Sequence, residues 1–313
     1  MDFWQTQKRA RQVTTLYLLL FLFLTAVAAL LVEFGMRYVA QEQYDPPMPL
    51  AGCVFLGMTF LISLAQYSCF KVSGGKFVAE SMGAMKVDPE ADFAQKQLAN
   101  IVEEIAIASA LPVPALYILD ANEINAFAAG LAPDSAVIAV TKGALEKLSR
   151  DELQGVIAHE FGHIQNGDML IGLRLAAMIM GFYFIFFMGL RMMQMTPRFG
   201  RRSNGRGANP IVVLALFLFL AGAFTWFFGS ILKAMVSRQR EYLADASSVQ
   251  YTRNPEGLAN ALRKIAHESA HDMPKSGMAY SHLYFNVSSS FMSLFATHPP
   301  LQERIERITG KKK

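Results

Sequence analysis

The chain has 313 residues, of which 53% are hydrophobic and 17% are charged, and its formal net charge is +4. This composition is more apolar than that of an ordinary soluble domain, so we expect part of the surface to face lipid. The small positive charge requires no polyanionic partner, and we expect the protein to bind no nucleic acid. Its two cysteines, Cys53 and Cys69, are too few for a zinc site built from cysteines.

Two uncharged apolar runs near the N-terminus predict transmembrane helices. Residues 13–32 contain no charge over 20 positions, and residues 49–70 contain none over 22. Each run can cross about 30 Å of hydrocarbon as a helix. The first run is longer than the apolar core of a secretory signal, which has roughly 7 to 15 residues, and no small-x-small cleavage site follows it. We therefore expect it to remain as an anchor.

Two further apolar runs occur in the second half of the chain. Residues 211–232 are uncharged over 22 positions and predict a spanning helix. Residues 175–190 offer only 16 uncharged positions, slightly fewer than the usual span of about 17 to 25. The sequence leaves open whether this run crosses fully. We therefore expect about four transmembrane helices.

The distribution of basic residues predicts the orientation of these helices. Lysine and arginine are in excess before the first span and after the second, which places the N-terminus and the polar region after residue 70 in the cytoplasm. The connector 191–210 disagrees, because it carries five arginines and no acid. Either the earlier charges dominate or this hairpin does not cross fully. We interpret its arginines as a solvated loop that meets anionic lipid headgroups.

The polar remainder, residues 71–168 and 233–313, is too short for two independent cores, so we expect one domain built from both stretches. After a glycine-containing linker, Asp88-Pro89-Glu90 predicts the start of a helix. Short apolar runs separated by turn residues then predict a small sheet. These runs are residues 114–120, 125–130 and 135–140.

Residues 149–167 predict a capped amphipathic helix. Ser149 and Glu152 have the spacing of a capping box, and an apolar stripe follows them. Asn166-Gly167 supplies the stop signal. The helix is therefore expected to belong to the polar domain and to end just before the apolar run 175–190.

The segment HEFGH on this helix carries the chemistry. His159 and His163 are four residues apart, so both project from one face and can reach one metal ion at about 2.0 to 2.1 Å. Glu160 stands beside the first histidine, where a glutamate takes the proton of a water molecule. The alternative is a pair of solvated surface histidines. The presence of a third metal ligand would distinguish a metal site from a pair of surface histidines.

We expect that ligand from the segment SRQREYLADA, residues 237–246, in which Glu241 and Asp245 share one helix face. If residues 169 to about 236 form a membrane hairpin, the start of this second helix arrives beside the end of the first. Glu241 can then be the third ligand, and Asp245 can accept a hydrogen bond that orients a histidine. The alternative for Glu241 is a surface ion pair with Arg238.

The segments HEFGHIQNGD and SRQREYLADASSVQYTRNP, with the hairpin between them, resemble the HtpX-type membrane zinc peptidases. These are gluzincins, similar in core to the CAAX prenyl endopeptidases and the OMA-type mitochondrial peptidases. The resemblance covers roughly residues 88–310. It implies an α+β membrane protein with about four transmembrane helices and a mainly helical, zincin-like domain with a small β-sheet. It also implies one Zn²⁺ per chain, held by His159, His163 and Glu241, with Glu160 as the catalytic glutamate.

The same resemblance implies two further roles. A late His-Pro in these enzymes matches His298-Pro299, which implies that His298 helps to stabilise the oxyanion. The alternative for His298 is a turn residue before the helical segment PPLQERIERI, and both interpretations stay open. An edge strand near residues 125–130 would bind an extended peptide through backbone hydrogen bonds. The substrate-binding residues implied there are Asn125, Ala126 and Phe127.

We therefore expect a zinc metalloendopeptidase in a bacterial inner (cell) membrane, with its catalytic domain in the cytoplasm. Its substrates would be polypeptides, chiefly membrane proteins and damaged ones among them, and its partner is the lipid bilayer. A role in quality control is implied only by the resemblance, and the oligomeric state stays open. The expected organisation is a transmembrane pair (1–70), a first peptidase part (71–168), a transmembrane hairpin (169–236) and a second peptidase part (237–313).

Three alternatives remain. A site-2-type intramembrane protease would need its motif inside a hydrophobic span, whereas Asp151, Glu152 and Asp168 flank this one. A prenyl-peptide processing enzyme typically has more spans around a large chamber. A metal-free membrane scaffold or chaperone adaptor belongs to a different class, and it would contain no stoichiometric zinc.

Overall fold

The computed structural model describes residues 3–40, 44–195, 210–268 and 298–310. The chain divides into two compact units. The first contains residues 71–172 and 234–313 with the start of the chain, and the second contains residues 14–70 and 173–233. Most of the arginine-rich connector, residues 196–209, lies outside the described part of the chain.

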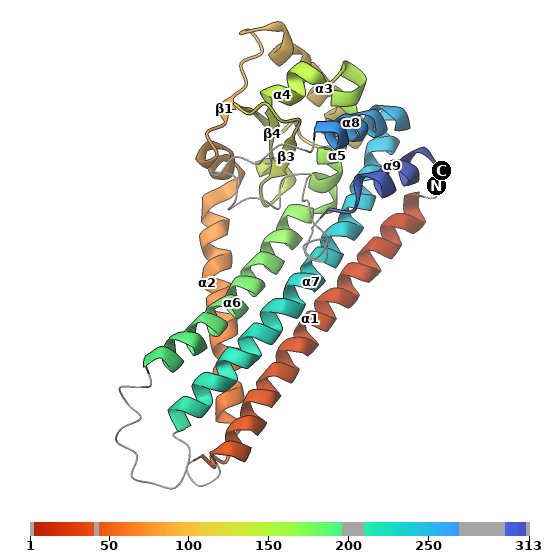
Figure 1. Cartoon of the computed structure of the whole chain (residues 1–313). Coiled ribbons are helices and arrows are strands. Elements are labelled where there is room, and N and C mark those ends of the chain that lie inside the picture. Colours follow the sequence, from red (N-terminus) through yellow and green to blue (C-terminus); the bar gives the residue numbers. More distant parts are fainter. Residues whose placement is uncertain (1–2, 41–43, 196–209, 269–297, 311–313) are drawn as a thin grey trace. The chain divides into compact units, whose positions relative to one another are not determined.

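Four helices among the described residues are long and apolar enough to cross a membrane. The run whose crossing the sequence leaves open belongs to one of them, a helix of 28 residues, which is about 42 Å long at 1.5 Å per residue. The four are α1 (Phe3–Val39), α2 (Leu50–Ser81), α6 (Asp168–Met195) and α7 (Pro210–Thr252) (Figure 1). The expectation of about four spanning helices is confirmed.

The apolar segments of these helices pack around a common core in the second unit. Val32 of α1, Phe55 of α2 and Ile185 of α6 are fully buried in it. Helices α6 and α7 approach closely, since a Cβ atom on Gly222 would lie only 2.4 Å from the backbone nitrogen of Phe186. Small residues at such crossings allow direct backbone contact, which stabilises helix pairs in lipid, where apolar burial supplies little driving force.

The first unit contains a four-stranded sheet of order β1-β2-β4-β3. Strands β2 and β4 are parallel, and the two outer pairs are antiparallel. Strand β3 therefore lies at an edge, as the sequence predicts. Strand β1 has only two residues, too few for a periodic signal in the sequence. The strands are β1 (Met85–Lys86), β2 (Ala115–Leu119), β3 (Ala126–Ala129) and β4 (Val137–Thr141).

Five α-helices lie wholly within the described part of this unit, together with the short 3-10 helix Pro133–Ser135, and the fold is α+β. Two local expectations are wrong. The helix expected at Asp88-Pro89-Glu90 begins later, because the Asp92 side chain accepts a hydrogen bond from the Gln95 backbone N–H at 2.8 Å and caps it. The helices are α3 (Phe93–Ser109), α4 (Lys142–Lys147), α5 (Arg150–Asn166), α8 (Pro255–Glu268) and α9 (Leu301–Thr309).

The second wrong expectation is the linker after residue 70, because α2 continues as a helix to Ser81. Glycine in a helix interior costs about 1 kcal/mol relative to alanine. Here a Cβ atom on Gly75 would lie 2.6 Å from the carbonyl oxygen of Ala129 at the end of β3. Close packing against the sheet therefore requires glycine at this position, and tertiary contact overrides its low helix propensity.

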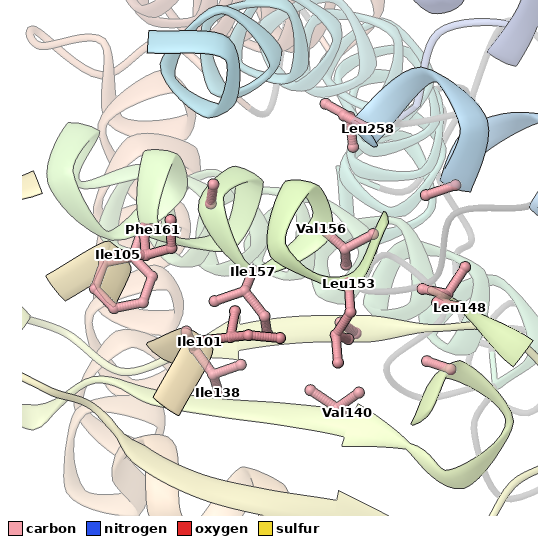
Figure 2. Close-up of a cluster of buried hydrophobic side chains, with 14 of the residues drawn as sticks. Ile101, Ile105, Ile138, Val140, Leu148, Leu153, Val156, Ile157, Phe161 and Leu258 are labelled. Carbon is pink, nitrogen blue, oxygen red and sulfur yellow. The ribbon is translucent and has the colours of Figure 1, made fainter. Parts of the chain in front are cut away.

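The core of the first unit lies between α5 and the sheet (Figure 2). Ile138 and Val140 of β4 are fully buried on the face toward α5, where Ile157 and Phe161 pack. The alternate residues of the sheet pack on the opposite face against Ala79 near the end of α2. Each fully buried aliphatic side chain contributes about 1.5–3 kcal/mol. The sheet is therefore buried on both faces, and its packing against α5 fixes the position of the helix that carries the HEFGH segment.

The N-terminus of α5 is held by the expected capping box, which is confirmed. The Glu152 carboxylate accepts a hydrogen bond from the Ser149 N–H at 2.7 Å and pairs with the Lys264 ammonium of α8 at 2.6 Å. Burial alone would raise the pKa of Glu152, but the Lys264 ammonium and the Ser149 N–H outweigh it and lower the pKa below 4.5. The ionised carboxylate therefore contributes stability at neutral pH.

Replacement of Glu152 by alanine is expected to lower the free energy of unfolding by about 1–2 kcal/mol at pH 7. The difference in the free energy of unfolding between wild type and variant should be fully present above the ordinary glutamate pKa. It should disappear as the pH falls through the lower pKa of Glu152 in the folded state. Thermal melts of the metal-free protein at pH 7 and pH 3 measure this. The exposed Asp151 on the same turn serves as a control when replaced by asparagine. An equal deficit of Glu152→Ala at both pH values would contradict the expected role of the charge.

Candidate metal centre

Helices α5 and α7 lie in direct contact at the HEFGH segment. A Cβ atom on Gly162 would lie 3.0 Å from both the Cα of Ala244 and the Cβ of Ser247. One turn further along, the Ser248 hydroxyl donates to the Gly155 carbonyl at 2.7 Å. The glycine inside the motif therefore lets the two backbones approach, and this approach brings side chains of α7 to the histidines of α5.

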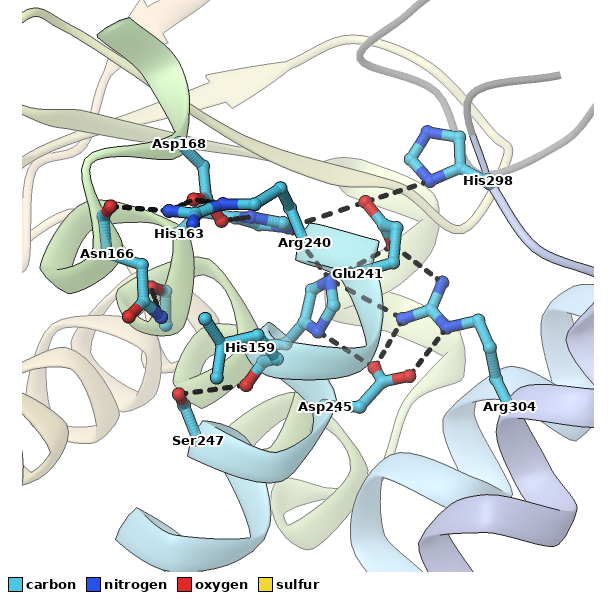
Figure 3. A network of polar contacts seen from close by, with 12 residues as sticks. His159, His163, Asn166, Asp168, Arg240, Glu241, Asp245, Ser247, His298 and Arg304 are labelled. Atoms are coloured by element: carbon cyan, nitrogen blue, oxygen red, sulfur yellow. Dashed lines mark hydrogen bonds and ion pairs between the residues drawn. The ribbon is translucent and has the colours of Figure 1, made fainter. Parts of the chain in front are cut away.

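Three potential metal donors converge where the helices meet (Figure 3). The Nε2 atoms of His159 and His163 are 3.1 Å apart. Glu241 places Oε1 3.5 Å from the Nε2 of His163 and Oε2 3.6 Å from the Nε2 of His159. Two ligands at 2.0–2.1 Å from a tetrahedral ion are about 3.3 Å apart. The donor spacing and the donor set of two imidazoles and one carboxylate therefore fit a zinc ion.

The opposite ring nitrogens of both histidines face carboxylates. The Nδ1 of His159 is 3.0 Å from Asp245 Oδ1, and the Nδ1 of His163 is 2.8 Å from Asp168 Oδ2. An Nδ1–H donated to a carboxylate orients the ring and leaves the Nε2 lone pair for a metal. The sequence predicts Asp245 beside a histidine, and the structure places it there. For Asp168 the sequence indicates only a charge that flanks the motif.

These carboxylates also raise the pKa of both histidines. Burial disfavours the charged ring of His159, but hydrogen bonds to Asp245 and Glu241 outweigh burial and raise its pKa to about 9. Burial likewise lowers the pKa of His163, and Asp168 more than restores it. The metal-free site is thus rich in negative charge that favours cations, and a metal ion has to displace protons from it.

Arg304 of α9 contacts the carboxylates of the site that come from α7. Its guanidinium is fully buried and lies 3.0 Å from Glu241 Oε2 and 2.6 Å from Asp245 Oδ1. Burial alone would lower the pKa of Arg304, but the carboxylates of Asp245 and Glu241 raise it. His298, before α9, places its Nδ1 3.1 Å from Glu241 Oε1, so it lies beside a metal donor.

Sequence reasoning missed Arg304, although one signal was available. Leu301, Ile305 and Ile308 mark the apolar face of α9, and Arg304 lies on that face three residues after Leu301. Charged residues are rarely buried unless they are paired. An arginine within an apolar stripe therefore predicts a buried ion pair.

The remaining predicted residues lie around this cluster. Glu160 is 3% exposed and its charge contributes to the raised pKa of Arg304 after those of Asp245 and Glu241. Strand β3 packs against α5. Directly before that strand, Asn125 receives a hydrogen bond from the Ala126 N–H at 2.9 Å and donates its own N–H to Thr141.

Phe127 packs on the opposite face of the sheet, among the residues that contact the end of α2. Every residue of β3 is at most 7% exposed. A peptide that pairs with the outer edge of this strand must therefore displace atoms that cover it.

A helix with H-E-x-x-H beside a glutamate from a second helix is the donor arrangement of the gluzincin class of metallopeptidases. The chain belongs to peptidase family M48, whose model matches residues 92–312. The predicted class of enzyme, a metallopeptidase of HtpX type, is confirmed. The motif helix α5 is not one of the four apolar helices, so the site-2 interpretation is not supported.

Similar proteins cover nearly the whole chain. A protein named Protease HtpX homolog from Streptococcus uberis is 36% identical over 311 residues, which cover 98% of this chain and 99% of that relative. Another of the same name, from Caldanaerobacter subterraneus subsp. tengcongensis, is 34% identical over 293 residues, covering 92% and 93%. The crystal structure of S. mikatae Ste24p matches with 17% identity and a TM-score of 0.47, over 98% of this chain and 66% of that one.

Proposed function

We propose that this protein is a zinc-dependent endopeptidase that cleaves membrane proteins, damaged ones among them, at the cytoplasmic face of a bacterial membrane. The observation that carries the proposal is the convergence of three donor atoms while both Nδ1 atoms are engaged by carboxylates. Its relatives are named as proteases. The excess of basic residues beside the first two apolar runs supports the cytoplasmic orientation.

In this proposal His159, His163 and Glu241 hold one zinc ion. A zinc ion held there would lower the pKa of a water molecule and would polarise the scissile carbonyl as a Lewis acid. Glu160 accepts the proton of the attacking water and later delivers it to the leaving amine. His298 donates a hydrogen bond to the developing oxyanion, a contribution worth about 3–4 kcal/mol for a well-placed donor.

The substrate would bind as an added strand along β3, with backbone hydrogen bonds supplying affinity and little side-chain preference. The Ala126 N–H already donates to the Asn125 side chain. Pairing at this position therefore requires the Asn125 amide to turn away. Such a binding mode suits a protease that accepts many unfolded segments, which supports a role in quality control.

Metal removal is expected to abolish cleavage. The purified protein should contain one zinc per chain and should cleave casein and a denatured membrane-protein substrate. A chelator should stop both reactions, and added Zn²⁺ should restore them, because the three donors supply the only ligand cluster found among the described residues. Metal analysis by mass spectrometry and cleavage assays measure this. Absence of stoichiometric zinc together with absence of cleavage would instead favour a metal-free membrane scaffold, and stoichiometric zinc without cleavage would contradict the proposed activity.

A further inference from the structure

The junction between α5 and α6 is held by a side chain from α7. Helix α5 ends at Asn166, Gly167 adopts a left-handed conformation with φ of 67°, and α6 begins at Asp168. Arg240 of α7 donates a hydrogen bond from Nη2 to the Asn166 carbonyl at 2.5 Å and another from Nε to Asp168 Oδ1. The side chains of Arg240 and Asp168 are only 7% and 9% exposed.

The two oxygens of Asp168 serve two partners (Figure 3). Oδ1 accepts from Arg240, and Oδ2 lies 2.8 Å from the Nδ1 of His163. Arg240 also directly precedes Glu241 in α7. The ion pair therefore touches one potential metal ligand and is adjacent in the chain to another.

Burial of this ion pair costs desolvation free energy, which a contact between apolar side chains at the same place would not. Desolvating two charges is compensated only when both are paired and hydrogen-bonded. The planar guanidinium can bind the carboxylate and the helix-terminal carbonyl together, whereas a lysine ammonium is a single point charge. The pair is neutral as a whole. A bound divalent cation therefore meets no net repulsion from it.

We propose that Asp168 and Arg240 are positioning residues that act as one unit on the metal centre. Asp168 fixes the ring of His163, and Arg240 fixes Asp168 and the α5–α6 junction against the turn that carries Glu241. The affinity for the metal thus depends on how the first turn of α6 and the Arg240 turn of α7 pack together within the first unit. This inference rests on the proposed zinc site and adds two residues to it.

The test measures zinc affinity on the full-length protein in detergent by competition with a chelator of known affinity. Asp168→Asn is expected to weaken zinc binding by about 10- to 100-fold, because it loosens His163 and leaves the Arg240 cation unpaired beside the donors. Arg240→Gln should weaken it less, and Arg240→Lys should retain part of the affinity. The double variant Asp168→Asn/Arg240→Gln should bind zinc more tightly than Asp168→Asn alone, since no buried charge is stranded.

The control is Arg263→Gln, which removes an exposed ion pair with Glu256 on α8 and should leave the zinc Kd within about twofold of wild type. Melting temperatures of the metal-free variants, measured with excess chelator, separate stability from metal binding. If Asp168→Asn and Arg240→Gln lower this temperature but keep the wild-type zinc Kd, the pair is only a structural clasp and the inference is wrong. If the wild-type protein itself binds no zinc, the proposed function fails and this inference falls with it.

Discussion

Replacement of Glu160 by glutamine is expected to reduce kcat for peptide cleavage by about 10²- to 10⁴-fold, the usual contribution of a general base. Glutamine has nearly the same shape but cannot accept the proton of the attacking water. Because Glu160 is not among the three converging donors, the variant should still contain one zinc per chain. Cleavage kinetics and metal analysis on the same preparation measure both quantities.

The control for this variant is Asp151→Asn, on the exposed first turn of the same helix. It should keep wild-type kcat and zinc content. Substantial cleavage by Glu160→Gln would contradict the proposed mechanism. Loss of zinc from this variant would show instead that Glu160 helps to hold the metal.

Replacement of Arg304 by methionine is expected to destabilise the protein by about 3–5 kcal/mol, the usual effect of removing one partner of a buried ion pair. The guanidinium is fully buried and compensates both Asp245 and Glu241. Methionine fills similar space but removes the guanidinium from both carboxylates, which then keep only histidine rings beside them among the described residues. Denaturant unfolding of the metal-free protein, followed by circular dichroism, measures the loss.

A matched control lies three residues further along the same helix. Arg307 is 48% exposed, pairs with Glu303 and covers the Tyr242 ring, so Arg307→Gln should cost about 1 kcal/mol or less. Adding Asp245→Asn to Arg304→Met should recover part of the stability, because it removes one stranded charge. If the two arginine variants were equally stable, Arg304 would not be the buried counter-charge that its contacts indicate.

Local regularity explains which parts of this protein can be predicted from its sequence. His159 and His163 share a face because four residues make about one helical turn, whatever surrounds them. The capping box at Ser149 and Glu152 is likewise a contact between residues three apart. The uncharged runs show which helices can enter a bilayer, since length and hydropathy alone decide that.

Contacts between distant residues explain what the sequence leaves undetermined. Arg304 and His159 are 145 positions apart, yet their side chains meet at 3.4 Å. The residues that flank either position in the sequence do not indicate this contact. The continuation of α2 through Gly75 depends in the same way on the backbone of β3.

The amino-acid order therefore determines the membrane helices, the metal-binding motif and the class of enzyme, because each depends on residues that lie close together in the sequence. The three-dimensional packing decides which charges surround the motif. Arg304 reaches His159, and Arg240 reaches Asp168 beside His163, only because α9 and α7 bring them next to α5. A buried charge finds its partner by proximity in space, and proximity between remote segments is a property of the whole fold.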